Sequence, residues 1–299
     1  MSRLGLWFVL ILFSPAVFSL TFTLPETGSR MIGSLQYHQV QKGETIAKIA
    51  DDYGVGFLAL MAANKGVDPF LPTPGQALTI PSQLLLPDVP YQGIVVNLAE
   101  LRLYYFWPDK KHVSVFPVGI GRIGRDTPMM ETHVSQKRPN PTWTPPQSIR
   151  AEYAKKGVTL PDVVPSGPDN PLGLFALRLA FGVGDYLIHG TNKNFGIGLR
   201  VSSGCIRMMP KDIDWLFHQV KVGEKVRIIN EPIKVSLEPD RTVYMETHEP
   251  LTRSDGKKGE LVVPKELTWW LDEFKLSDAL VSAGLVTQNG IPLVVAKTN

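Results

Sequence analysis

The segment Tyr186–Met208 reads YLIHGTNKNFGIGLRVSSGCIRM, and the interpretation of the whole chain starts from it. Its first residues form an apolar strand that ends at His189, and Cys205 comes directly after a glycine near its end. A histidine at a strand end and a cysteine after a glycine turn suit nucleophilic catalysis. The thiolate is the reactive form of cysteine, and a neighbouring imidazole can take the proton from sulfur. We therefore predict Cys205 as the nucleophile and His189 as its base.

Three residues beside this pair are predicted to support it. A backbone carbonyl near Gly190 could orient the imidazole, as a third group does in a catalytic triad. The small residues Ser203 and Gly204 let backbone N–H groups approach a developing oxyanion.

Cys205 is the single cysteine of the 299-residue chain, so no intramolecular disulfide can form. A lone cysteine in an exported protein invites oxidation and mispairing, and it needs a reason to be present. The residues alone leave two interpretations open. Cys205 is either a catalytic thiol or a buried, inert thiol that serves as a small apolar side chain and never meets His189.

Residues 1–20 predict a secretory signal peptide. A short basic start precedes the apolar run Leu4–Phe13, which is too short to span a bilayer comfortably, and Pro15 breaks that run. We place cleavage near Ser19 or Leu20; an uncleaved membrane anchor is the alternative. No later apolar run is long enough to cross a membrane, so we expect no stable membrane span after cleavage.

Residues 37–81 predict a small α+β unit in the order strand, helix, helix, strand. Glu44 begins a helical pattern, a second helical run follows Gly56, and a closing strand is bounded by Pro81.

Residues 93–230 are expected to form a mainly β domain. Alternating apolar residues between Ile94 and Pro117 predict short strands in an antiparallel sheet, a sandwich or a barrel. The proline-rich stretch 139–171 predicts a lid or a mobile loop with one helical stretch.

Two further segments carry no motif to which we assign chemistry. Thr21–Gly33 is polar and turn-rich, which predicts a linker. Residues 231–299 form an extension with strand signals and a Trp269–Trp270 pair.

Metals, cofactors and nucleic acids are not expected. The other histidines lie in separate segments without ligand spacing, and no HExxH, CxxC or nucleotide-binding glycine loop is present. The formal net charge is only +3, and no run of lysine and arginine indicates a phosphate-binding face.

Together these segments resemble a known family. His189-Gly190 followed by Ser-x-Gly-Cys-x-Arg is similar to the signature of the YkuD-type L,D-transpeptidases. The upstream stretches VVNLAELRLYYF, VFPVGIGRIGRDTP and NPTWTPP resemble that family's opening hairpin and substrate-side loop. Residues 37–81 resemble a LysM module, a glycan-binding fold, although a spacer that has lost glycan affinity is the alternative. Nearly the whole mature chain resembles the enterobacterial ErfK/YbiS type.

The chain departs from the family pattern in two segments. Ser203 stands where many relatives carry histidine, so the resemblance gives it no acid or base role. Met129 and Met130 follow Pro128, where relatives often have glycine, so the local turn can differ.

The resemblance implies a YkuD-like β-sandwich or barrel with short helices and a periplasmic enzyme without a cofactor. Cys205 would attack the carbonyl at the L-centre of diaminopimelate in a peptidoglycan tetrapeptide stem, and D-alanine would leave. An amine would then take the acyl group from the thioester. Arg207 would hold a substrate carboxylate, or it would form a structural ion pair.

The branch that the chain resembles implies a particular acceptor amine. This is the C-terminal lysine of an outer-membrane lipoprotein, which the reaction would anchor to the wall. A direct cross-linking enzyme that joins two diaminopimelate residues is the first alternative. A non-catalytic, wall-binding protein is the alternative from another class.

Overall fold

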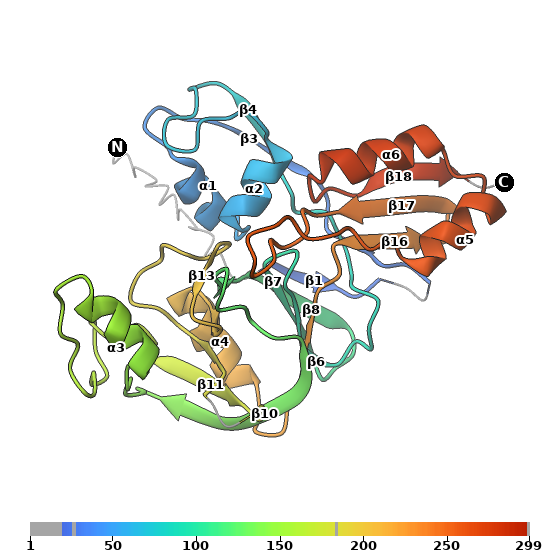
Figure 1. Cartoon of the computed structure of the whole chain (residues 1–299). Coiled ribbons are helices and arrows are strands. Elements are labelled where there is room, and N and C mark those ends of the chain that lie inside the picture. The colour runs from blue at the N-terminus through green and yellow to red at the C-terminus, as the bar shows by residue number, and fades with distance from the viewer. Residues whose placement is uncertain (1–19, 26–27, 183–184, 298–299) are drawn as a thin grey trace, which may run out of the picture.

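The computed structural model describes residues 20–25, 28–182 and 185–297, which form three neighbouring units (Figure 1). The predicted signal peptide, apart from Leu20, lies outside the described residues. Within the described ranges, no helix is both long enough and apolar enough to cross a membrane.

A nine-stranded sheet forms the body of the largest unit. Its strand order is β1-β8-β7-β6-β15-β10-β11-β12-β14. The strands are β1 (Leu20–Thr23), β6 (Gly93–Asn97), β7 (Arg102–Phe106), β8 (His112–Pro117), β10 (Met130–Pro139), β11 (Phe175–Leu179), β12 (Leu187–His189), β14 (Ile206–Arg207) and β15 (Lys225–Ile229).

Alternate residues of the central strands fill two apolar cores, one on each face of this sheet. Val96 and Leu103 belong to the core that the apolar face of α4 (Pro210–Gln219) covers. Their neighbours Val95 and Tyr104 belong to the core on the opposite face. Because side chains of a strand point to opposite faces in turn, a strand covered on both sides is buried along its whole length. This confirms the mainly β fold predicted for the region.

The sheet is mixed, whereas an antiparallel sheet was among the expectations from the sequence. β15 runs parallel to β6, and β12 runs parallel to β14. The alternation of apolar residues reports that a strand is half-buried or buried, and it carries no information on the direction of a partner far away in the chain. Two more short pairs accompany the sheet: β2 (Met31–Ile32) with β5 (Leu84–Leu85), and β9 (Ile120–Gly121) with β13 (Arg200–Ser202).

The small unit near the N-terminus has the predicted βααβ order. Its elements are β3 (Gln36–Gln39), α1 (Ile46–Asp52), α2 (Phe57–Ala63) and β4 (Ala77–Ile80). β3 and β4 pair antiparallel, and both helices bury apolar residues against them. The Thr45 hydroxyl accepts the Lys48 N–H at the start of α1, which is the ordinary role of a threonine cap.

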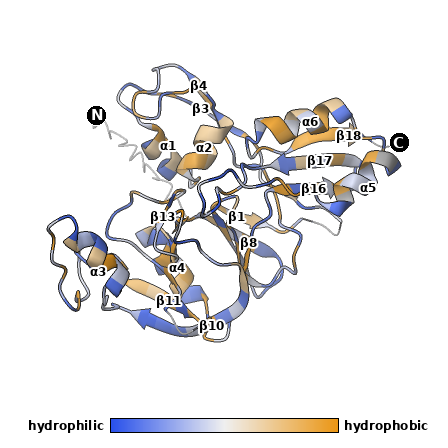
Figure 2. Cartoon of the chain, in the orientation of Figure 1, coloured by the Kyte–Doolittle hydropathy of each residue, from blue (hydrophilic) through white to orange (hydrophobic). Residues whose placement is uncertain are grey.

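The C-terminal unit combines a three-stranded sheet with two helices. Its elements are β16 (Ile233–Leu237), β17 (Thr242–Thr247), α5 (Lys265–Glu273), α6 (Asp278–Thr287) and β18 (Leu293–Lys297). Figure 2 shows that α6 is mostly apolar along its length. Val281 of α6 and Val243 of β17 share one core, so the unit has a hydrophobic interior of its own.

The linker predicted over Thr21–Gly33 is wrong in part. β1 pairs with β8 at the edge of the nine-stranded sheet, and Phe22 packs against the core on that face. β2 begins at Met31 and pairs with β5. Threonines between the apolar residues of β1 gave this segment a polar composition, although threonine is a good strand former.

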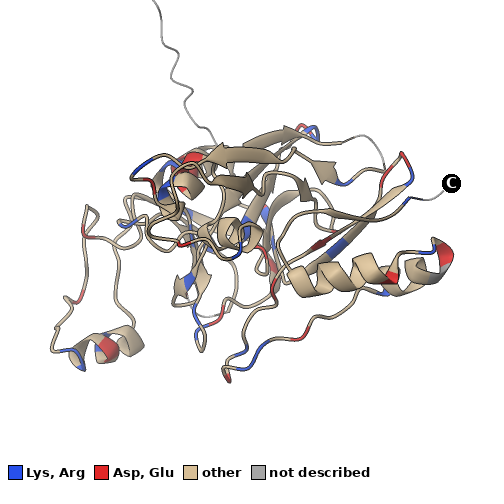
Figure 3. Ribbon diagram, turned by 90° about the horizontal axis from the view of Figure 1, so that it is seen from above, with Lys and Arg blue, Asp and Glu red and all other residues tan. Residues whose placement is uncertain are grey.

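Residues 139–171 form an arm that stands away from the body of the molecule (Figures 1 and 3). The arm carries α3 (Gln147–Ala154), which has no buried residue. Arg122 forms an ion pair with Glu152 of α3, and Arg125 donates to the Ser148 hydroxyl at 3.1 Å. The arm, which the sequence predicted as a lid or a mobile loop, therefore contacts the loop after β9 through polar side chains. No buried apolar residue of α3 contributes to this contact.

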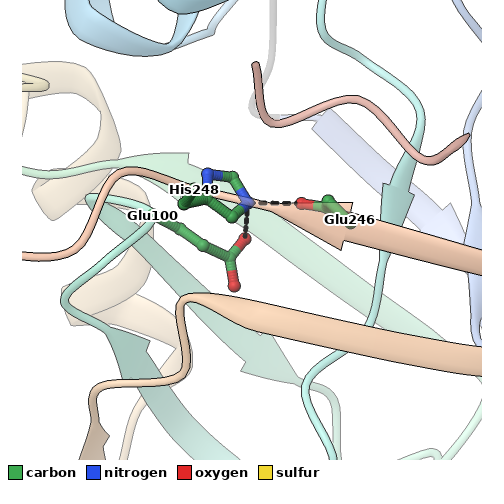
Figure 4. A group of neighbouring side chains, drawn as sticks. All are labelled: Glu100, Glu246 and His248. Atoms are coloured by element: carbon green, nitrogen blue, oxygen red, sulfur yellow. Dashed lines mark hydrogen bonds and ion pairs between the residues drawn. The ribbon is translucent and has the colours of Figure 1, made fainter. Parts of the chain in front are cut away.

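A buried cluster of charges joins the nine-stranded sheet to the C-terminal sheet. We call it the ionic cluster; three of its members appear in Figure 4, and the whole set is Glu100, Arg102, Lys234, Glu246 and His248. The Lys234 ammonium lies 3.0 Å from a carboxylate oxygen of Glu100 and 3.0 Å from one of Glu246. Arg102 lies 2.9 and 3.3 Å from the same two carboxylates.

The two carboxylates of the ionic cluster are ionised. Burial by itself would raise their pKa values, since a low dielectric disfavours charge. The neighbouring Lys234 ammonium opposes burial and holds the pKa of Glu100 and of Glu246 below the usual value. The buried positive charges of Lys234 and Arg102 therefore compensate the buried negative charges of Glu100 and Glu246.

Candidate active site

Two parallel strands, β12 and β14, place the predicted nucleophile and base on one face. Ile188 pairs with Ile206, and both side chains are buried in the core that α4 covers. Side chains alternate along a strand, so His189 and Cys205, each one residue away from this pair, project to the other face. The register pairs His189 with Arg207, so Cys205, two residues before Arg207, lies on the neighbouring strand segment beside β12.

The ring of His189 is held in one tautomer. Its Nδ1 lies 2.6 Å from the carbonyl oxygen of Gly190. A carbonyl only accepts hydrogen bonds, so Nδ1 carries the proton when the ring is neutral, and Nε2 keeps its lone pair. This is the contact considered for Gly190 from the sequence. It leaves Nε2 as the atom that can take a proton.

The imidazole is neutral at physiological pH. Burial lowers the pKa of His189 to about 4, and the Arg207 guanidinium lowers it further. The carbonyls of Gly190 and Leu172 act in the opposite direction, but burial outweighs them. A neutral imidazole can accept a proton during the reaction. The buried surroundings of His189 disfavour the imidazolium form in the resting enzyme.

The thiol of Cys205 is protonated at rest. The residue is half-buried, and its Sγ–H donates to the Asp185 carbonyl at 3.6 Å. Burial is the largest influence and raises the pKa of the Cys205 thiol; the Leu187 N–H lowers it, the Asp185 carboxylate raises it and Arg207 lowers it, and the net shift is upward. The resting site is thus a neutral thiol beside a neutral imidazole, with no preformed thiolate.

We predict that alkylation of Cys205 by iodoacetamide will accelerate with pH through the neutral range and continue to accelerate at alkaline pH. The raised thiol pKa makes the thiolate fraction grow across that interval, and Cys205 is the one cysteine that can react. Mass spectrometry of the intact protein gives the rate at each pH. A rate that is already constant from about pH 6 upward would indicate a thiolate–imidazolium pair and contradict this state.

The turn before Cys205 is fixed by two hydroxyl groups. The Gly204 N–H donates to Ser202 Oγ at 3.2 Å, and Ser202 Oγ donates to the Cys205 carbonyl at 2.5 Å. Thr127 Oγ1 donates to the Gly204 carbonyl at 3.0 Å. Gly204 has a φ of 108°, a conformation that other residues rarely adopt. Sequence analysis missed Thr127, and it included Ser202 only as the first residue of the Ser-x-Gly-Cys-x-Arg signature without assigning it a role.

Ser203 and Gly190 differ in what the structure requires of them. Ser203 is exposed, and the Arg125 guanidinium of the loop after β9 lies 3.5 Å from its hydroxyl. Gly190 is closely surrounded, because a Cβ there would lie 3.0 Å from Ile213. A side chain at Gly190 would push the carbonyl that holds His189.

Arg207 lies on the same face as His189 and has an unused donor. Its backbone pairs with Gly119, and its Nε is buried without a hydrogen-bond partner. Among the described residues, no carboxylate forms an ion pair with Arg207, so the structural ion pair considered from the sequence is not seen there. A guanidinium with a free donor can receive an anionic group.

One group of side chains has a composition that suits a metal ion: Glu100, Glu246 and His248 of the ionic cluster (Figure 4). The carboxylate oxygens in question are already bound by Lys234 and Arg102. A metal would have to displace two buried cations, and the group fits an ion-pair network better. His248, which the sequence placed in no cluster, is therefore a member of one.

Comparison with known proteins identifies the family. The L,D-transpeptidase catalytic domain family matches residues 91–228, the L,D-transpeptidase C-terminal domain family matches residues 232–295, and the LysM domain family matches residues 38–81. The chain is 48% identical to the probable L,D-transpeptidase YcfS of Escherichia coli K12, with 99% of this chain and 96% of YcfS covered.

Two more relatives from the same organism agree with this. Identity to the probable L,D-transpeptidase ErfK/SrfK is 44%, over 97% of this chain and 95% of that protein. Identity to the probable L,D-transpeptidase YbiS is 46%, over 87% of this chain and 86% of that protein. Similarity of this extent covers all three units, and the chain belongs to the L,D-transpeptidase family.

Proposed function

We propose that this enzyme cleaves the diaminopimelate–D-alanine bond of peptidoglycan tetrapeptide stems through a thioester on Cys205. The observation that carries the proposal is the contact of His189 Nδ1 with the Gly190 carbonyl, which fixes the proton on Nδ1 and leaves the lone pair of the neutral ring on Nε2. General-base removal of a thiol proton needs a neutral imidazole with an available lone pair. The lowered pKa of His189 supplies that state.

The reaction follows from these positions. His189 Nε2 takes the thiol proton as sulfur attacks the carbonyl at the L-centre of diaminopimelate. The Gly204 N–H is already used by Ser202, so we assign the Cys205 N–H to the oxyanion of the tetrahedral intermediate. The imidazolium then returns the proton to the nitrogen of D-alanine, which departs and leaves the thioester. The acceptor amine attacks next, with His189 again serving as the base.

Arg207 is assigned to the carboxylate of the departing D-alanine. The buried and unpaired Nε, together with the absence of a carboxylate partner in the described ranges, supports this role. Its positive charge also favours the thiolate as it forms, because the charges of Arg207 and Cys205 attract each other.

The three units support a division of tasks. We propose residues 37–81 as a peptidoglycan-binding LysM module, 93–230 as the catalytic domain and 231–299 as a C-terminal domain that packs on it. We further propose that the chain is exported by cleavage of residues 1–20 and acts in the periplasm.

The acceptor that we propose is the side-chain amine of a lysine at the C-terminus of an outer-membrane lipoprotein. The similarity to ErfK/SrfK and YbiS over most of the chain supports this branch of the family. A protein acceptor needs more contact surface than a short stem peptide, and the appended units supply surface of that kind. A direct diaminopimelate cross-link is the competing reaction.

We predict that pure enzyme given tetrapeptide-rich sacculi and equal amounts of two acceptors will attach mainly the peptide that ends in lysine. The other acceptor is a second stem peptide. Mass spectrometry of muropeptides gives both products, and released D-alanine gives total turnover. D-alanine release with attachment mainly to the stem peptide would contradict the proposed lysine acceptor. It would leave the proposed cleavage through a Cys205 thioester in place. No D-alanine release would remove the proposed function itself.

A further inference from the structure

A loop of the C-terminal unit reaches the catalytic domain near β9 and β13 (Figure 1). We call residues 250–259, which lie between β17 and α5, the bridging loop. The bridging loop folds back on itself. The Arg253 N–H donates to the Lys257 carbonyl at 2.8 Å, and a Cβ on Gly259 would clash with the carbonyl oxygen of Leu251. Leu251 packs against the core of the catalytic domain, so the near end of the loop is fixed there.

Arg200 of β13 joins the bridging loop to the strands that lead to the nucleophile. One terminal nitrogen of its guanidinium donates to the Thr252 carbonyl at 2.8 Å, and the other lies 2.6 Å from a carboxylate oxygen of Asp126. The Arg200 Nε lies 3.4 Å from the Gly121 carbonyl of β9. β13 ends at Ser202, whose hydroxyl fixes the turn before the nucleophile. The same side chain thus binds the C-terminal unit and the strand that enters this turn.

Asp126 gives the bridging loop a second connection to the nucleophile turn. The Ser254 hydroxyl donates to Asp126 Oδ2 at 2.6 Å, while Asp126 Oδ1 receives Arg200. The next residue, Thr127, is buried and donates to the Gly204 carbonyl at 3.0 Å. A Cβ on Gly204 would lie 3.6 Å from the Asp126 carbonyl oxygen, so this segment itself lies against the turn. A displacement of Asp126 would therefore move the donor that holds the Gly204 carbonyl.

The position of the bridging loop depends on these polar contacts, because a cavity of about 510 Å³ lies between the loop and the catalytic domain. Residues 251–255 of the loop line this cavity, together with Thr127 and Met129 of the catalytic domain. Beyond Leu251, apolar packing does not fill the space under the loop. The hydrogen bonds of Arg200 and Ser254 therefore determine where the loop lies.

We propose that the bridging loop positions the nucleophile for thioester formation, with Ser254, Asp126 and Arg200 as positioning residues. These side chains act through Thr127 and Ser202, which hold the turn, and not on the substrate. Attack requires the sulfur to be aligned with both the carbonyl carbon and the base, and a misplacement of about 1 Å can lower a rate about 100-fold. The proposal rests on the proposed function and gives the C-terminal unit a task in it.

The test uses the full-length enzyme and follows D-alanine release from a free tetrapeptide. Ser254→Ala should lower kcat about threefold to tenfold and leave KM unchanged, because the turn shifts while the substrate contacts remain. Ser254→Thr should keep the wild-type kcat, since its hydroxyl can still donate to Asp126. Asp126→Ala removes both contacts and should lose more, and Ser254→Ala added to it should lower kcat no further. Ser282→Ala is the matched control, because Ser282 is an exposed serine on α6 of the same unit.

A second measurement does not depend on stem cleavage, so it decides the proposal even if the enzyme releases no D-alanine. It is the rate at which iodoacetamide alkylates Cys205 at a fixed pH, well below the thermal midpoint of each variant. A loosened turn exposes the thiol, so Asp126→Ala should react at least about twofold faster than wild type, and Ser282→Ala should react at the wild-type rate.

Three results would overturn the proposal. One is a wild-type kcat in Ser254→Ala, and another is a Ser254→Thr variant that is as slow as Ser254→Ala. The third is an unchanged alkylation rate in Asp126→Ala. The thermal midpoint of Ser254→Ala should equal that of wild type. A fall in this midpoint large enough to account for the lost activity would make the contact a structural one and contradict a positioning role.

Discussion

Cys205→Ala is expected to abolish release of D-alanine from tetrapeptide stems and transfer to any amine. No other residue of the chain can supply a thiolate, so the loss should reach at least about 10⁴-fold in kcat. The measurement is D-alanine release from purified stems over a long incubation. His189→Ala should lose nearly as much, and the double variant should be no worse than Cys205→Ala, because the two residues act as one unit.

The fold should survive these substitutions. Cys205 is half-buried, and alanine removes only its sulfur. The thermal midpoint and the circular dichroism spectrum of Cys205→Ala serve as the control. Measurable turnover by a folded Cys205→Ala preparation free of wild-type protein would refute the assignment of the nucleophile.

Lys234→Met is expected to destabilise the protein by about 3–5 kcal/mol, the cost of breaking a buried ion pair by removing one partner. Lys234 has no exposed surface and contacts both carboxylates of the ionic cluster, so its loss leaves Arg102 and His248 as the basic partners of two buried acidic groups. Denaturant unfolding at neutral pH gives the free-energy difference. Lys297→Met is the matched control, because Lys297 is exposed on the same C-terminal sheet and should change stability by less than about 0.5 kcal/mol.

The pH dependence of this loss identifies its cause. The lowered pKa values of Glu100 and Glu246 stabilise the wild-type fold above the pKa of an unfolded glutamate, and this contribution declines as acid protonates them. In Lys234→Met the buried carboxylates favour the protonated form, so acid helps the variant. The difference in free energy of unfolding between wild type and Lys234→Met should therefore decrease from about pH 7 to about pH 4. A constant difference would assign the loss to packing.

The chemistry of the site was predictable from a short segment because its main parts are local. A strand that ends at His189 and a glycine before Cys205 are visible in 23 consecutive residues, and β12 and β14 place them without other help. Thr127 could not be found in this way. Its hydroxyl donates a hydrogen bond to the Gly204 carbonyl, which is 77 positions away in the chain. A threonine before a proline occurs in many structural roles, so its sequence context gives no sign of this one.

The neutral resting state of Cys205 and His189 also could not be predicted from the sequence. The motif suggests an imidazole that draws a proton from sulfur, but burial lowers the pKa of His189 and raises the pKa of Cys205, and so sets the resting protonation states. Both are properties of packing. The ionic cluster was hidden for the same reason, because its members His248 and Glu100 are far apart in the chain and meet only in the folded protein.

The parallel pairing of β6 with β15 has a consequence for the order in which the chain can fold. Val226 pairs with Ile94, so the central pair of the sheet joins segments about 130 residues apart, and synthesis at about 5–20 residues per second separates them by roughly 10 s. During that interval β6 and β7 can form a hairpin, but the sheet has no partner for the second edge of β6. Contacts of such long range are slow to form, so the catalytic domain should mature only after its last strand is available.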